Sequence, residues 1–168
     1  MARATPRRIV IGIGNPDRGD DAAGREVARL LRGTLPDGVE VVEHNGEATA
    51  LLARLDGIAA AFLVDACASG APAGTVRRFD VVAAPLPLDA FGLSTHGLGL
   101  SEAIELARTL GRLPSLCIVY AIEGECFEIG AALSPPVGAA AADLARRVAA
   151  EIVLDAQPGG QARCTKPR

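Results

Sequence analysis

Short apolar runs alternate with amphipathic stretches along most of the chain. The apolar runs predict strands over 8–14, 39–43, 59–65, 74–80 and 116–122. Apolar residues at helical spacing between these runs predict helices over 20–33, 46–55, 97–111 and 137–154. Strands that alternate with helices are typical of parallel βαβ units. The pattern therefore predicts an α/β fold: a three-layer sandwich in which a mainly parallel, twisted sheet of about five strands has helices on both faces.

The length of the chain, 168 residues, suits one domain with a sizeable core. We place this domain at residues 1–156. Residues 157–168 are rich in glycine, proline and basic side chains, a composition that is typical of a disordered tail.

The composition excludes several classes of protein. The net charge of −3, the 3% share of aromatic residues and the absence of Trp argue against a nucleic-acid surface, which needs clustered Lys and Arg and stacking rings. The 4 cysteines show no C-x-x-C spacing, so a reducing compartment is the simpler interpretation. The apolar run behind the basic N-terminus is only about six residues long, too short for a signal-peptide core. No stretch approaches the ~20 apolar residues of a membrane span, and we expect a cytoplasmic protein.

Three side chains with metal-binding chemistry follow predicted strands or precede predicted helices. Asp21 comes after the first strand, which closes in Gly12-Ile13-Gly14-Asn15, at the entry to a helix. Asp65 ends the third strand, and His96 precedes the third helix. In an open α/β sheet, ligands bind outside the carboxyl ends of the strands. Two carboxylates and one imidazole at this edge are suitable ligands for a divalent transition metal, with a position left open for substrate.

The acidic side chains also have structural interpretations. Asp20, next to Asp21, is expected to cap the helix that follows it. Asp65 ends an apolar run, so burial requires its carboxylate to be hydrogen-bonded, paired or metal-bound. Glu47 follows the second strand and Glu123 ends the fifth, so we expect both either to line the same cleft or to lie at the surface.

Other chemistries find less support. The dinucleotide fingerprint G-x-G-x-x-G would need glycine at position 17, where the chain has Asp17. Ser94 lies two residues before His96, but a serine nucleophile needs a third group that orients the histidine, and the chain has no Gly-x-Ser-x-Gly elbow. Cys67 has no cationic neighbour in the sequence that would lower its pKa, so we expect it to pack in the core. His44 is expected at the edge of the cleft or at the surface.

Four motifs together carry a family resemblance. They are Gly12-Ile13-Gly14-Asn15, Asp20-Asp21, Val64-Asp65-Ala66 and Ser94-x-His96-x-Leu98-Gly99-Leu100. Over residues 8–153, their order and spacing resemble those of hydrogenase maturation endopeptidases. The resemblance implies a protease that removes a C-terminal peptide from the precursor of the large subunit of nickel-iron hydrogenase, after nickel has been inserted. Residues 17–19 and 22–23 depart from the family pattern, but neither departure removes a ligand.

The same resemblance assigns roles to single residues. Carried over by motif, Asp21, Asp65 and His96 fall on the three metal-contacting positions of the family. They would bind nickel that is already present in the precursor, so the protease would need no tightly bound cofactor of its own. Beside these three residues we expect a substrate cleft lined by Gly14, Asn15, Glu47 and Glu123.

Two rival functions use part of the same pattern. A non-catalytic nickel carrier or maturation chaperone would use the same three ligands, but only a protease shortens the nickel-loaded precursor. A peptidyl-tRNA hydrolase shares the Gly-x-Gly-Asn-Pro opening. That family has a nearby Thr-x-His-Asn and a basic cleft, whereas here His44-Asn45 comes too late and lacks the threonine, and the net charge of −3 has the wrong sign.

Overall fold

The computed structural model of the chain describes residues 6–87, 89–91 and 95–155, and for residues 95–98 it describes the backbone alone. The predicted tail, 157–168, and Ser94 lie outside these residues.

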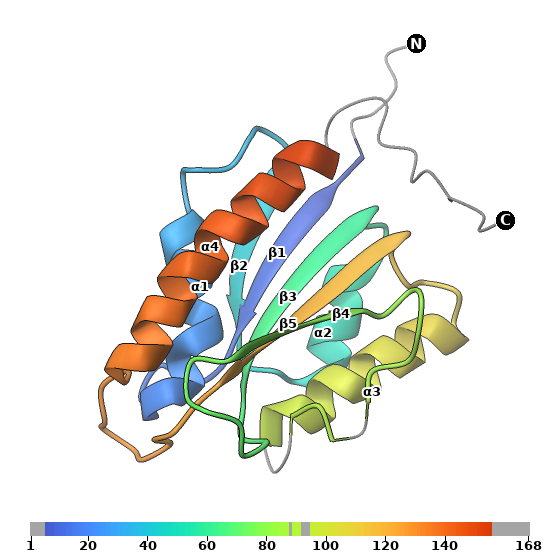
Figure 1. Cartoon of the computed structure of the whole chain (residues 1–168). Coiled ribbons are helices and arrows are strands. Elements are labelled where there is room, and N and C mark those ends of the chain that lie inside the picture. The colour runs from blue at the N-terminus through green and yellow to red at the C-terminus, as the bar shows by residue number, and fades with distance from the viewer. Residues whose placement is uncertain (1–5, 88, 92–94, 156–168) are drawn as a thin grey trace, which may run out of the picture.

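In the described part of the chain, five strands form one sheet (Figure 1). The strands are β1 Arg8–Ile13, β2 Val39–His44, β3 Ala60–Cys67, β4 Val76–Asp80 and β5 Leu116–Glu123. Their order across the sheet is β2-β1-β3-β5-β4. The first four in this order run parallel, and only β4 is antiparallel to its neighbour β5. The predicted, mainly parallel α/β sheet is therefore confirmed.

The helices form a layer on each face of this sheet (Figure 1). They are the 3-10 helix η1 Gly19–Ala22, α1 Ala23–Leu31, α2 Ala48–Leu55, α3 Thr95–Thr109 and α4 Pro135–Asp155. Helices α1 and α4 contact each other on one face, and α2 and α3 contact each other on the other. None of the described helices has both the length and the apolar character that crossing a lipid bilayer requires.

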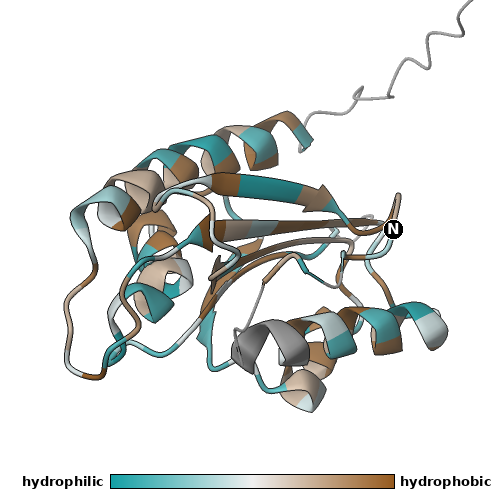
Figure 2. Cartoon of the chain, turned by 60° about the horizontal axis from the view of Figure 1, so that its bottom comes forward, coloured by the Kyte–Doolittle hydropathy of each residue, from teal (hydrophilic) through white to brown (hydrophobic). Residues whose placement is uncertain are grey.

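The sheet separates two apolar cores, and β1 contributes to both. Ile9, Ile11 and Ile13 are buried in the core under α2 and α3, while Val10 is buried in the core under α1 and α4. Successive side chains of a strand point to opposite faces, so a strand covered on both sides is apolar throughout. Figure 2 shows most of the strands largely in the brown of hydrophobic residues, whereas the helices and one strand also carry teal, hydrophilic residues.

Two glycines allow α1 to lie directly on the sheet. A Cβ atom at Gly12 would lie 2.2 Å from the carbonyl oxygen of Gly24, and a Cβ at Gly24 would lie 2.2 Å from that of Val64 and 2.3 Å from that of Ile13. Neither position can hold a side chain without moving backbone. This close crossing fixes the start of α1, and η1 before it, at the carboxyl ends of β1 and β3.

The boundaries differ most from prediction around the first helix. We predicted one helix over 20–33, but the chain forms η1 before α1 and ends the helix at Leu31. The predicted helix over 97–111 begins earlier, at Thr95, so that His96 lies inside the first turn of α3 instead of before it.

Candidate active site

The candidate site lies where β1 and β3 end and α3 begins. Figure 1 shows η1, the start of α3 and the segment after β5 at the same end of the sheet. Helix η1, which carries Asp21, contacts β3, which carries Asp65. Helix α3 contacts β3 as well. The fold therefore brings together the three elements on which the predicted metal-contacting residues lie.

Asp21 lies against the loop that follows β1. It is buried, and the backbone N–H of Asn15 donates to its Oδ2 atom at 3.2 Å. The loop can fold back so tightly because Gly14 has φ +144°, and a Cβ atom there would lie 1.8 Å from the carbonyl oxygen of Asp21. The Gly-x-Gly-Asn motif thus has a local purpose, since it places one carboxylate across the end of β1.

Asp65 is fully buried and lies two residues before the end of β3. The backbone N–H of Ala66 donates to its Oδ1 atom at 2.8 Å. Leu63 and Cys67 belong to the core under α2 and α3, and the alternation along the strand puts Asp65 on that same face. Asp65 therefore faces the helix layer that contains α3.

The first turn of α3, with His96, rests on the segment that follows β2. A Cβ atom at Gly99 would lie 2.1 Å from the carbonyl oxygen of Gly46, so the glycine allows the helix to touch this backbone. Among the side chains that the structure describes, no three of His, Cys, Asp and Glu lie close enough together to hold a metal ion. The side chain of His96 is not among them, and the fold places only its backbone at this edge.

Asp20 has a different role from Asp21. We expected Asp20 to cap the helix that follows it. Instead, its fully buried carboxylate accepts hydrogen bonds from the backbone N–H groups of Ser134, Glu125 and Cys126, at 2.7, 2.9 and 3.0 Å. Burial alone would raise the pKa of Asp20, but these hydrogen bonds outweigh it and lower the pKa. Asp20 therefore ties the segment between β5 and α4 to η1.

Glu123 is also buried in a structural network. Its carboxylate accepts hydrogen bonds from Ser69 Oγ at 2.7 Å, Gly70 N–H at 2.8 Å and Cys67 Sγ at 3.1 Å. These bonds hold the segment after β3 against the end of β5. Burial raises the pKa of the Cys67 thiol to about 12, so the thiol stays protonated and packs in the core, as expected.

Glu47 and His44 organise the segment between β2 and α2. Glu47 is exposed and caps α2, accepting from the backbone N–H groups of Thr49 at 2.9 Å and Ala50 at 2.8 Å. His44 is half-buried, and its Nδ1 atom accepts from the N–H of Gly46 at 2.9 Å. Because Gly46 supports α3 at Gly99, His44 acts indirectly on the position of the first turn of α3.

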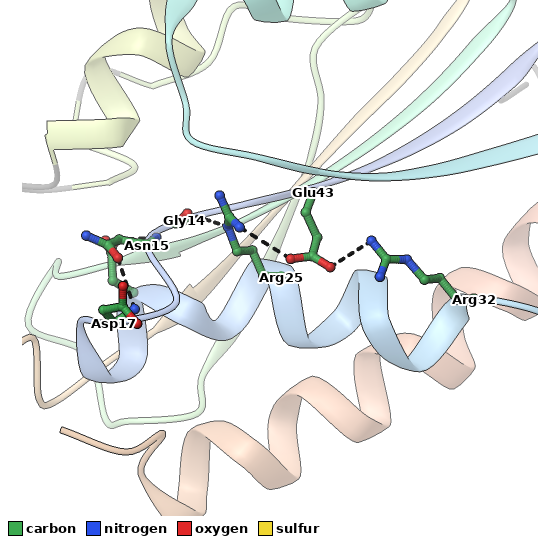
Figure 3. A network of polar contacts seen from close by, with 7 residues as sticks. Gly14, Asn15, Asp17, Arg25, Arg32 and Glu43 are labelled. Atoms are coloured by element: carbon green, nitrogen blue, oxygen red, sulfur yellow. Dashed lines mark hydrogen bonds and ion pairs between the residues drawn. The ribbon is translucent and has the colours of Figure 1, made fainter. Parts of the chain in front are cut away.

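The sequence analysis did not identify Arg25, which is hydrogen-bonded to the loop after β1 (Figure 3). Its Nε atom donates to the carbonyl oxygen of Gly14 at 2.7 Å, and its Nη1 atom pairs with Glu43 Oε2 at 3.3 Å. Arg32 pairs with the other oxygen of Glu43 at 2.7 Å. Asn15 turns back on the same loop and accepts from the N–H of Asp17 at 3.0 Å. The sequence offered one indication of this role: Arg25 lies four residues after Asp21, one turn along the predicted helix, and therefore near the same loop.

The chain matches known hydrogenase maturation proteins in sequence and in structure. The model of a family described as hydrogenase maturation protease matches residues 25–151. The hydrogenase expression/formation proteins HupD of Thiocapsa roseopersicina and HoxM of Azotobacter vinelandii are 28% and 27% identical over 138 and 153 residues. These matches cover 80% and 89% of this chain, and 62% and 73% of the respective relatives.

The solved structure of the hydrogenase maturating endopeptidase HybD from E. coli has the same fold. It superposes with a TM-score of 0.79 at 25% sequence identity, over 89% of this chain and 93% of that one. The family model covers most of the sheet and all four α-helices except the first two residues of α1 and the last four of α4. The sequence, the fold and the site lead to one conclusion: the chain belongs to the hydrogenase maturation protease family.

Proposed function

We propose that this protein is the endopeptidase that removes the C-terminal extension from the precursor of a nickel-iron hydrogenase large subunit. The observation that carries this proposal is the pair of buried carboxylates, Asp21 and Asp65, on contacting elements at the carboxyl edge of the sheet, in a chain of this protease family. Asp20 and Glu123, which are also buried, hold neighbouring segments of the fold together.

We propose further that Asp21, Asp65 and His96 contact nickel that the precursor carries. Carboxylate oxygens and an imidazole nitrogen suit this ion. The arrangement supports the idea because η1 brings Asp21 to β3, while Asp65 faces the layer in which α3 carries His96. Such a site recognises a precursor whose metal is in place, and the nickel remains part of the substrate.

The remaining cleft residues would support the peptide next to this site. In our proposal Gly14 and Asn15 line the cleft, because their loop carries the backbone N–H that positions Asp21. In the same proposal Glu47 and Glu123 support the cleft indirectly, since their carboxylates hold α2 and the segment after β3. Cys67, Cys117 and Cys126 are free thiols, which fits a reducing compartment, and we place the processing step in the cytoplasm.

Incubation with purified, nickel-loaded precursor tests this function. We expect mass spectrometry to show a shortened large subunit and a released C-terminal peptide. Asp65→Asn should stop the reaction, because the amide keeps the shape of the side chain and removes its charge. If the protein were a carrier or chaperone, the precursor would stay at full length with the wild type as well as with Asp65→Asn. That result would reject the protease assignment.

A further inference from the structure

The segment between β5 and α4, residues 124–134, is fastened to the loop that carries the site. Gly130 N–H donates to the carbonyl oxygen of Asp17 at 2.8 Å, and Gly19 N–H donates to that of Ala131 at 3.2 Å. Arg18 Nε adds a bond to the carbonyl oxygen of Phe127 at 2.9 Å. Together with the buried carboxylate of Asp20, these bonds make 124–134 and 15–20 one connected surface. We call this surface the rim.

The rim presents one large apolar side chain to solvent. Ile129 is 87% exposed, more than any other large apolar residue of the described chain. It lies in a turn that is closed by a hydrogen bond from Ala131 N–H to the carbonyl oxygen of Glu128 at 3.2 Å. Gly130, the third residue of this turn, has the positive φ, +81°, that a type II turn requires there. Single exposed apolar residues are common on proteins, but Ile129 is held in a closed turn that is bonded directly to the site loop.

Exposed acidic side chains share the rim with this apolar residue. Asp17, Glu125 and Glu128 are exposed and belong to the two segments that make the rim. A protein surface that matches the rim therefore has an apolar depression with basic residues around it. On the side of α1, the rim also borders a pocket of about 280 Å³. The lining of this pocket is mixed: small and apolar residues form one part, and two arginines and two glutamates of α1 and β2 form the other, namely Pro16, Gly19, Ala22, Ala131, Ala132 and Leu133, and Arg25, Arg29, Glu26 and Glu43.

We propose that the rim is the docking surface for the folded body of the large-subunit precursor. Ile129 is its apolar anchor, and the pocket beside Ala132 receives a side chain of the same partner. This inference rests on the proposed function, and it adds a second recognition element to the substrate-borne metal. The continuity of the rim with the loop of Asp21 means that a partner docked there presents its C-terminal extension at the carboxyl edge of the sheet.

Three variants test the proposal. Ile129→Asp adds a charge to the anchor, and Ala132→Arg fills the pocket. Leu110→Asp is the matched control, because Leu110 is 51% exposed and follows the far end of α3, away from the rim. Melting temperatures identify any variant that fails to fold. Precursor binding is measured by biolayer interferometry, and kcat and KM are measured for cleavage of nickel-loaded precursor.

We expect Ile129→Asp and Ala132→Arg to weaken precursor binding and to raise KM by about tenfold, as loss of a contact in the centre of an interface does. Their kcat should stay at the wild-type value, because no group of the site changes, and Leu110→Asp should match the wild type throughout. A rise in KM for either rim variant supports the docking surface. If both rim variants bind precursor as tightly as Leu110→Asp, the proposal is overturned. If the wild type binds precursor without cleaving it, the protease assignment fails, while the binding comparison still decides whether the rim docks.

Discussion

At the scale of single residues, the structure separates two neighbouring aspartates that are alike in sequence. Asp20 accepts hydrogen bonds from residues more than 100 positions away, whereas Asp21 accepts from Asn15 N–H in the adjacent loop. Glu123 likewise reaches Ser69 and Gly70 across more than 50 positions. Sequence could place Asp21 and Asp65 at the sheet edge, because Asp21 follows one strand and Asp65 lies at the end of another. It could not assign the partners of Asp20 and Glu123, because these come from loops whose mutual position depends on the whole fold.

This difference makes the aspartate pair a direct test of role. Asp20→Asn should lower the free energy of unfolding by about 2–3 kcal/mol, because the amide loses the charge that accepts several buried hydrogen bonds and turns a donor toward other donors. Asp21→Asn should cost less stability, since its remaining oxygen can still accept from Asn15. The rate at which Asp21→Asn cleaves the precursor should fall more than roughly 10–100-fold. A loss of roughly that size is typical when a residue that only hydrogen-bonds to a metal ligand is changed. Urea unfolding and precursor cleavage measure the two effects, and normal cleavage by Asp21→Asn would remove that residue from the site.

A second residue-scale prediction concerns His44 and pH. Burial lowers the pKa of His44 below its ordinary value of 6.5. The positive charges of Arg54 and Arg25 also lower this pKa, while the negative charge of Glu47 raises it. The unfolded chain therefore takes up a proton more readily than the native protein. The stability that neutral His44 provides is complete above pH 6.5 and is lost as the pH falls through the lower, native pKa.

His44→Asn isolates this contribution, because Oδ1 of the asparagine can still accept from Gly46 N–H but does not titrate. We expect the wild type to lose more stability than the variant between pH 7.5 and pH 5.5 in urea unfolding. Every other titratable group is common to both proteins and cancels in the comparison. Equal losses would show that the hydrogen bond to Gly46 is insensitive to protonation.

At the scale of elements, periodicity predicted most of the helices and strands but not how closely they pack. The unbroken apolar run of β1 identifies a strand that is buried on both faces. The first predicted helix is instead divided into η1 and α1 in a segment where Gly14 and Gly24 allow close contact between its backbone and β1 and β3. That contact depends on two strands whose adjacency is set by the sheet, so no local pattern predicts it. The same reason explains why the bond of Arg25 to Gly14 escaped prediction.

Two glycines on helices give a matched test of this packing. Gly24→Ala should destabilise the protein by at least about 2 kcal/mol, because the new methyl group would overlap the carbonyl oxygens of Val64 and Ile13 and force backbone to shift. Gly138→Ala in α4 should be neutral or stabilising by up to about 1 kcal/mol, since its nearest neighbour would be Leu133 Cδ2 at 3.7 Å and alanine favours the helix. Thermal and urea unfolding of both variants provide the measurement. A Gly24→Ala protein as stable as Gly138→Ala would contradict the close crossing of α1 and β1.

At the scale of the whole molecule, the α/β class, the parallel character of the sheet and the helices on both faces all follow from the order of apolar runs. The strand order β2-β1-β3-β5-β4 and the antiparallel direction of β4 do not, because they depend on which strand pairs with which. The fold gathers the ends of β1 and β3 with the start of α3, and it sets the rim beside them. We propose that the protease checks its substrate at two places, through the metal at the sheet edge and through the folded surface at the rim.

The central claim is that the metal carried by the precursor decides whether cleavage occurs. The most direct measurement compares matched precursor preparations with and without nickel, followed by mass spectrometry of the large subunit, with His96→Ala run in parallel. We predict loss of the C-terminal peptide only from nickel-containing precursor treated with the wild-type protein, and no loss with His96→Ala at an unchanged melting temperature. Equal cleavage of the nickel-free precursor, or full cleavage by His96→Ala, would contradict the account.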